Sequence, residues 1–164
     1  MKVSAIVYTS ATGFTARYAR ALARETGLPC VPLESSSALA RGEKVLCLGW
    51  LCAGRIKGLR QARARFRVAA VGAVGMAPHA DTAKLASDNA LGDTPLFYLR
   101  GGYAPRRLPL GYRLMMVPMA RMISRRSPKD EQERAMQDAF AHGGDWVSQA
   151  WTAPILAWLT GEAE

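Results

Sequence analysis

The stretch from residue 8 to residue 15 has the residue types and spacing that most clearly indicate chemistry. It reads Tyr-Thr-Ser-Ala-Thr-Gly-Phe-Thr and lies between an apolar run, Val3–Tyr8, and a helical pattern, Ala16–Arg24. A turn between a strand and a helix directs backbone N–H groups and the positive end of the helix dipole toward an anion. Hydroxyl side chains in the turn can add hydrogen bonds to phosphate oxygens. We therefore predict a phosphate site formed by Ser10, Ala11, Thr12, Gly13, Phe14 and Thr15.

This turn differs from the two commonest phosphate loops. It has no lysine at its end, which a nucleoside-triphosphate loop requires, and only one of the three glycines of a dinucleotide-binding turn. Neutral hydroxyls without a lysine favour a terminal monophosphate. In the alternative interpretation, the Ser and Thr side chains only cap the helix that follows.

The same stretch resembles the phosphate-binding loop of flavodoxins, which holds the phosphate of FMN. The family pattern has an apolar pair, an aromatic residue, a hydroxyl residue, a small residue, a threonine and apolar positions in the helix. Here these positions are occupied by Ile6, Val7, Tyr8, Ser10, Gly13, Thr15, Ala19 and Leu22. The resemblance implies a flavoprotein that binds FMN noncovalently and acts as an oxidoreductase or in electron transfer.

Two further loops follow predicted strands, and the resemblance implies that they lie beside the flavin ring. The first contains Trp50, Leu51, Cys52, Ala53 and Gly54. The second contains Ala73, Val74 and Gly75. The Trp50 ring either stacks on the flavin or packs at the end of the sheet. The small residues of the second loop either let the backbone approach the ring or form a tight connection.

Apolar runs alternate with helical patterns along the chain, which predicts βαβ units and a parallel sheet. The expected strands are Val3–Tyr8, Pro29–Leu33, Lys44–Gly49, Val68–Val74 and Leu96–Leu99. The expected helices are Thr15–Glu25, Ile56–Arg65, Thr82–Asn89 and Trp146–Leu159, with a short or degenerate helix within Glu34–Arg41. The predicted fold is α/β, a flavodoxin-like, doubly wound, five-stranded parallel sheet in the order 2-1-3-4-5. We expect one domain over residues 1–164, with a helical insertion after strand five at about 102–127.

The pattern changes after the fifth expected strand. Leu108–Ser124 is rich in Leu and Met, and Pro118 within it predicts a kink or two shorter helices. Ser127-Pro128 is a typical helix start, and Gly143-Gly144 a typical end. Asp145 is expected to cap the last helix.

Positive charge is concentrated in this insertion. The chain carries a net charge of +9, and residues 100–127 contain seven arginines and no Asp or Glu. Guanidinium groups pair well with carboxylates and phosphates, so an anionic substrate or redox partner is expected. The methionines Met115, Met119 and Met122 either form an interfacial segment for an anionic membrane surface or cover the domain's own core.

The insertion also resembles, more loosely, that of flavodoxin-like protoporphyrinogen oxidases. The likeness rests on length, basic charge, the Arg/Tyr/Met-rich segment that begins at Arg100, and the Asp145-Trp146 pair before the last helix. It implies a carboxylated tetrapyrrole as substrate. Two alternatives stay open: a generic electron shuttle without its own substrate, and a basic binding scaffold without flavin.

Other classes of site find no support in the sequence. His79 and His142 are far apart and have no carboxylate or cysteine cluster beside them, so no metal site and no protein-borne catalytic residue are predicted. The three cysteines lack metal or redox-pair spacing, which suggests a reducing compartment. No nucleic acid is expected, because aromatic residues do not alternate with the arginines. We expect a cytoplasmic protein, peripheral to the inner face of the membrane if the insertion binds lipid.

Overall fold

A parallel sheet forms the centre of the molecule. The computed structural model describes residues 2–161, and within them the main sheet has six strands. Five are neighbours in the order β2-β1-β3-β5-β6 and pair in parallel, whereas β4 pairs antiparallel with β3. Their bounds are β1 Ala5–Tyr8, β2 Cys30–Pro32, β3 Lys44–Cys52, β4 Arg55–Ile56, β5 Arg67–Gly75 and β6 Leu96–Arg100. The predicted α/β fold with a mostly parallel sheet is therefore confirmed.

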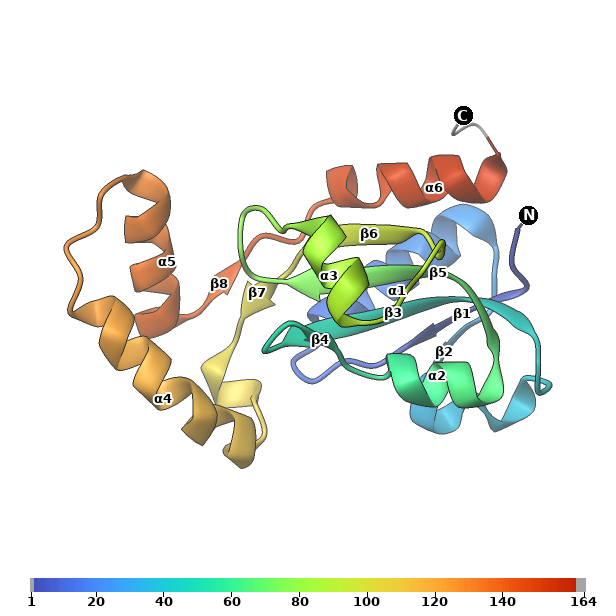
Figure 1. Cartoon of the computed structure of the whole chain (residues 1–164), viewed down its shortest axis with the longest axis horizontal. Helices are drawn as coiled ribbons and strands as arrows, with labels where there is room; N and C mark the ends of the chain where they lie inside the picture. The colour runs from blue at the N-terminus through green and yellow to red at the C-terminus, as the bar shows by residue number, and fades with distance from the viewer. Residues whose placement is uncertain (1, 162–164) are drawn as a thin grey trace.

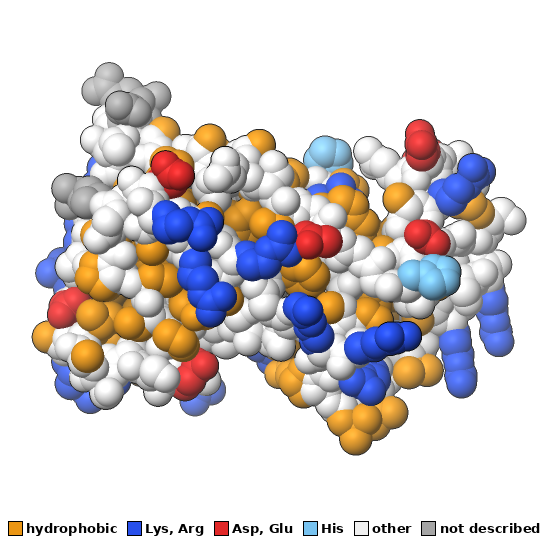
Figure 2. Space-filling view, turned by 180° about the vertical axis from the view of Figure 1, so that it is seen from behind, with side chains coloured by type: hydrophobic (Ala, Val, Ile, Leu, Met, Phe, Trp, Pro, Cys, Tyr) orange, Lys and Arg blue, Asp and Glu red, His pale blue; other side chains and the backbone are white. Residues whose placement is uncertain are grey.

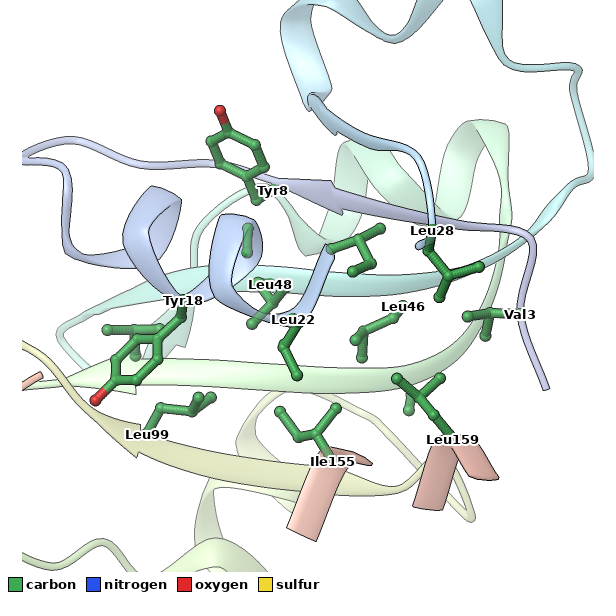
Figure 3. Close-up of a cluster of buried hydrophobic side chains, with 14 of the residues drawn as sticks. Val3, Tyr8, Tyr18, Leu22, Leu28, Leu46, Leu48, Leu99, Ile155 and Leu159 are labelled. Atoms are coloured by element: carbon green, nitrogen blue, oxygen red, sulfur yellow. The ribbon is translucent and has the colours of Figure 1, made fainter. Parts of the chain in front are cut away.

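Helices cover both faces of this sheet (Figure 1). On one face, α1 (Phe14–Thr26) and α6 (Ala153–Thr160) enclose a core that includes Tyr18, Leu22 and Ile155. These side chains converge with those of β3 and β6 in Figure 3. The opposite face carries α2 (Leu59–Arg65) and α3 (Thr82–Asp88), with η1 (Leu33–Ala38) beside them. Burial on both faces explains why the central strands are continuously apolar.

Two helices project from the sheet domain. Figure 1 shows α4 (Leu110–Ser124) and α5 (Glu131–His142) standing apart from the sheet, at the end of the molecule away from both chain ends. They are preceded by η2 (Pro105–Arg107) and bracketed by two short antiparallel strands, β7 (Gly102–Tyr103) and β8 (Gly144–Asp145). We call residues 104–143 the helical pair. The inserted segment therefore returns to the sheet domain only at residue 145, where β8 pairs with β7, and not at the predicted limit of about 127.

The helix predicted at Ile56–Arg65 starts too early. Ile56 lies in β4 and pairs with Leu51. The helix α2 begins after Gly58, whose left-handed φ of 88° lies outside the helical region. The extra strand arises because Ala53 and Gly54 both adopt positive φ and turn the chain back on β3.

Of the two alternatives predicted for the segment containing Pro118, a kink or two shorter helices, the second is wrong. One helix, α4, runs through Pro118. Proline removes one helical hydrogen bond, to the carbonyl of Leu114 four residues earlier. Leu114 is 62% exposed as a residue, so this proline lies on a helix that faces solvent rather than a core.

Two helix starts were placed too early. Asp130, not Ser127, caps α5, and its side chain accepts a hydrogen bond from the Glu133 N–H at 2.7 Å. The predicted cap at Asp145 is wrong because Asp145 is extended in β8, opposite Gly102. The last helix follows η3 (Gln149–Trp151) instead of starting at Trp146. The predicted stop at Gly143 is confirmed, since α5 ends there.

No helix within residues 2–161 is both long enough and apolar enough to cross a bilayer.

Candidate functional site

The turn between β1 and α1 has the geometry of an anion-binding loop. β1 ends at Tyr8 and α1 begins at Phe14, so the turn opens at the carboxyl end of a central strand. Gly13 occupies the N-cap position with φ of 99°, a conformation that L-residues rarely adopt. The Ser10 hydroxyl accepts hydrogen bonds from the N–H groups of Gly13 at 3.1 Å and Ala16 at 3.3 Å. Ser10 thus holds the shape of the turn.

Several donors of the turn have no partner. Across the described residues 2–161, no oxygen accepts a hydrogen bond from the N–H groups of Ala11, Thr12, Phe14 or Thr15. Thr15 is only 1% exposed as a residue, and its hydroxyl makes no hydrogen bond within that range. The first N–H groups of a helix have no acceptor within the helix, so these donors are available to an anion.

A cation from the helical pair approaches the same turn. A Cβ atom on Gly13 would lie 3.9 Å from Nη1 of Arg107, so the guanidinium group stands directly over the loop. Within the part of the chain that the structure describes, no carboxylate lies within 4.0 Å of Arg107. The loop has no lysine in sequence, but the tertiary structure provides a positive charge.

A cavity of about 300 Å³ adjoins the turn. Its walls come from the turn after β1, the carboxyl ends of β3 and β5 with the residues that follow them, β7 and the beginning of the helical pair. The two ring-side loops predicted from sequence are mostly strand, since Trp50–Cys52 belong to β3 and Ala73–Gly75 to β5. Of the residues predicted from sequence, it is lined by Ala11, Thr12, Phe14, Thr15, Trp50, Leu51, Cys52, Ala53, Val74 and Gly75. Three predicted loops therefore meet at one apolar hollow, because the carboxyl ends of parallel neighbours share one sheet edge.

Four predicted site residues lie outside the cavity lining. Ser10 and Gly13 shape the turn itself. Gly54 lies in the β3–β4 turn and lines a different hollow, next to Asp88. Ala73 is fully buried within β5, so its side chain faces the core and not a ligand.

The remaining wall was not predicted. It consists of residues after β5 and from β7 through α4: Met76, Gly102, Tyr103, Ala104, Leu108, Tyr112, Met115, Met116 and Met119. The last four of these recur at helical spacing, which the sequence could show. The sequence could not show that this helix face lies against the loop after β1 and the end of β3. No residue of α4 is buried, so the alternative that its methionines cover the domain's core is not what the structure shows.

Trp50 forms one wall of the cavity with a residue from α4. Its ring meets that of Tyr112 edge to face, with centroids 4.9 Å apart and an interplanar angle of 81°. Trp50 does not pack only against the end of the sheet, since it lines the cavity. Stacking of its ring on a flavin stays a prediction.

Burial raises the pKa of two side chains, Tyr103 at the cavity wall and Cys47 in the core of the sheet domain. Burial raises the pKa of the Tyr103 phenol above its ordinary 10.0, although Arg113 acts to lower it. Burial also raises the pKa of the Cys47 thiol to about 12, so this cysteine is a packing residue. Cys52, which lines the cavity, is partly exposed.

The insertion's arginines differ in how they are held. The Arg100 guanidinium lies 4.2 Å from the centre of the Trp146 ring, and Arg113 donates to the carbonyl oxygens of Arg106 and Leu108. Within residues 2–161, no insertion arginine pairs with a carboxylate. Figure 2 shows Lys and Arg side chains next to hydrophobic ones on the side of the molecule that carries the helical pair.

Among the described residues, no group of three or more His, Cys, Asp or Glu side chains could hold a metal ion. Comparison with protein-family models, curated proteins and solved structures finds no match.

Proposed function

We propose that the chain binds FMN noncovalently in this cavity and acts as a flavodoxin-like oxidoreductase or electron-transfer protein. The observation that carries the proposal is an apolar hollow beside a turn with unpaired donors and a nearby guanidinium group. FMN combines the two matching features, a flat and largely apolar ring and a terminal phosphate. A bound flavin would supply the transfer of electrons or hydride.

Each wall of the cavity has a role in this proposal. The N–H groups of Ala11, Thr12, Phe14 and Thr15 and the Thr15 hydroxyl would hold the phosphate, and Arg107 would balance its charge. Trp50 and Val74 would bound the ring. Tyr112, with the methionines of α4, would limit the access of water from the far side.

The sheet supports the same proposal. If β4 is counted as an appendage of β3, the remaining strands follow the order 2-1-3-4-5 of a doubly wound flavodoxin-like sheet. In that arrangement, ligands bind beyond the carboxyl ends of the strands where the winding reverses, between the first and third strands. The turn after β1 and the carboxyl end of β3, which carries Trp50, both line the cavity and so support this placement.

Titration of the purified protein with FMN and riboflavin tests the proposal, since riboflavin lacks the phosphate. We expect FMN to quench its fluorescence on binding and to bind at least about tenfold more tightly than riboflavin. Thr15→Val keeps the side-chain shape and removes the hydroxyl, so it should weaken FMN and leave riboflavin unchanged. Failure of saturating FMN to bind or to raise the melting temperature would contradict the proposal and favour a flavin-free scaffold.

For the substrate, we propose an anionic compound, with a carboxylated tetrapyrrole such as protoporphyrinogen as the specific candidate. The apolar methionines at the cavity wall and the unpaired arginines nearby support a large organic anion. Oxidation of protoporphyrinogen by the FMN-loaded protein would distinguish this enzyme from an electron shuttle without its own substrate.

We propose in addition that α4 contacts the inner, anionic surface of the membrane. Leu110, Leu114 and Val117 are 67%, 62% and 38% exposed, and their spacing places them on the side of α4 opposite Tyr112 and Met116. Arg121 continues this stripe, so an apolar surface is accompanied by positive charge. This combination is typical of helices that lie at a lipid interface.

A further inference from the structure

A second and larger cleft lies on the other side of the aromatic wall. It measures about 730 Å³ and is bounded by the β3–β4 hairpin, the start of α2 and the start of α4. Trp50 and Tyr112 line both this cleft and the proposed flavin cavity. A molecule in the cleft would therefore be separated from the flavin cavity by these two rings.

The charged side chains that line this cleft are all cationic. They are Arg55, Lys57, Arg60 and Arg63, and no Asp or Glu belongs to the lining. Such a concentration of one sign of charge, in a hollow with an apolar wall, focuses the electrostatic potential on whatever enters.

Two of these cations, Arg55 and Arg63, hydrogen-bond to backbone carbonyls, which do not neutralise their charge. Arg63 donates to the carbonyl oxygens of Asn89 at 3.1 Å and Ala90 at 3.0 Å, and Arg55 donates to the carbonyl oxygen of Asp88. These carbonyls fix the guanidinium groups but carry no net charge. The Asp88 carboxylate, the acid nearest to Arg55 in these contacts, pairs instead with Lys84 at 2.5 Å.

The other two cations are available to a ligand. The Lys57 ammonium lies 5.5 Å from the centre of the Tyr112 ring, and Arg60 is exposed on the first turn of α2. Across residues 2–161, neither has a carboxylate within 4.0 Å. A carboxylate bound here could replace water at both groups while an aromatic body lies against Trp50 and Tyr112.

We propose that this cleft is the substrate site, and that its substrate is an organic anion with at least two carboxylates on a body that carries aromatic rings. The redox role of the cleft rests on the proposed function, because Trp50 and Tyr112 separate it from the flavin cavity. Its capacity to bind the anion does not depend on flavin.

Calorimetric titration with naphthalene-2,6-dicarboxylate tests the inference, with the uncharged naphthalene-2,6-diamide as the matched probe. Both are titrated into the full chain, with and without FMN. We expect the dicarboxylate to bind and the diamide to bind at least about tenfold more weakly. The double variant Lys57→Gln/Arg60→Gln should weaken the dicarboxylate about tenfold or more while leaving FMN affinity within about twofold.

The matched control is Arg41→Gln/Lys44→Gln, which removes the same two charges at the opposite end of β3. Full binding by the control and loss by the cleft variant would support the inference. Equal loss in both variants, or equal binding of the two probes, would overturn it. Dicarboxylate binding without any FMN binding would refute the proposed function and leave the cleft standing; FMN binding without dicarboxylate binding would do the reverse.

Discussion

At the scale of single residues, Ser10 and Thr15 share one turn but have different partners. The Ser10 hydroxyl is engaged with two backbone N–H groups, as a helix cap would be. Thr15 is a buried residue that lines the cavity, and its hydroxyl makes no such bond within residues 2–161. The structure thus gives Ser10 a capping role, whereas ligand binding by Thr15 stays a prediction.

Arg107 gives the sharpest test at this scale. Arg107→Gln removes the one side-chain cation seen against Gly13 and should weaken FMN about fivefold at low salt, since an exposed charge contributes only about 1 kcal/mol. Riboflavin affinity should not change. The FMN affinity of the variant should also depend less on salt than that of the native chain, because a screened charge pair is gone.

Fluorescence titration at two salt concentrations measures both effects. Arg121→Gln is the matched control, since Arg121 is an exposed arginine of α4 that does not line the cavity. Unchanged FMN affinity of Arg107→Gln at low salt would show that the guanidinium group does not reach the phosphate.

Asp145 gives a pH-dependent prediction. Burial acts to raise its pKa, but hydrogen bonds from Arg17 and the Val147 N–H lower it by more, so the carboxyl pKa lies below its ordinary 3.8. A lowered folded-state pKa stabilises the fold above the ordinary value, and this contribution disappears as the pH falls through the folded-state pKa. Asp145→Asn should therefore lower the melting temperature at neutral pH, and this difference should shrink as the pH falls through the folded-state pKa.

Thermal unfolding followed by circular dichroism across this pH range provides the measurement. Asp93→Asn changes an exposed carboxylate that makes no side-chain hydrogen bond among the described residues, so it serves as control. A melting-temperature difference for Asp145→Asn that persists unchanged into acid would contradict the assignment.

At the scale of elements, the helical pair completes a cavity that the sheet domain only begins. The loops after β1, β3 and β5 form one side, and β7 through α4 form the other. α4 buries no residue of its own, whereas α5 buries Ala139 and Phe140. The Phe140 ring packs against Tyr103 with centroids 5.1 Å apart. The helical pair thus contributes to the site more than to the core.

This arrangement predicts that the helical pair can be removed without unfolding the sheet. Tyr103 and Gly144 are register partners, so an Asn-Gly turn can replace residues 104–143. We expect the shortened chain to retain a cooperative thermal transition but to bind FMN at least about tenfold more weakly, because it loses Arg107 and one cavity wall. Unfolding of this variant, or native FMN affinity in it, would each contradict the prediction.

At the scale of the whole molecule, charge and apolar surface are combined on the projecting end. The exposed large hydrophobic residues of the described chain are all on α4, and the insertion arginines have no carboxylate partners within residues 2–161 (Figure 2). Because α4 also lines the cavity, membrane contact through α4 would bring the cavity near the lipid surface.

Flotation with liposomes tests this contact. We expect binding to vesicles that contain anionic lipid, weakening as salt is added, and little binding to neutral vesicles. Leu110→Ser/Leu114→Ser should reduce binding to anionic vesicles several-fold, since each exposed leucine contributes apolar area on insertion. Retention on neutral vesicles alone, or no effect of the double variant, would argue against the contact.

The sequence by itself determined those features that depend on local order. The turn from Ser10 to Thr15 and the alternation of strands and helices were predictable, because they follow from spacing along a few consecutive residues. The stop of α5 at Gly143 was predictable for the same reason. By contrast, the prediction that Asp145 caps a helix was wrong because Asp145 pairs in β8 with Gly102 of β7. These two residues are some forty positions apart, so no local pattern indicates the pairing.

Only the tertiary structure decided what surrounds the turn. Arg107 approaches Gly13, and Tyr112 meets Trp50, because the chain after β6 leaves the sheet and returns beside its first loop. Periodicity revealed the apolar faces of α4 but not their neighbours, since a helix pattern contains no information on which distant loop it will face. The cavity and the cationic cleft exist only through these long-range contacts.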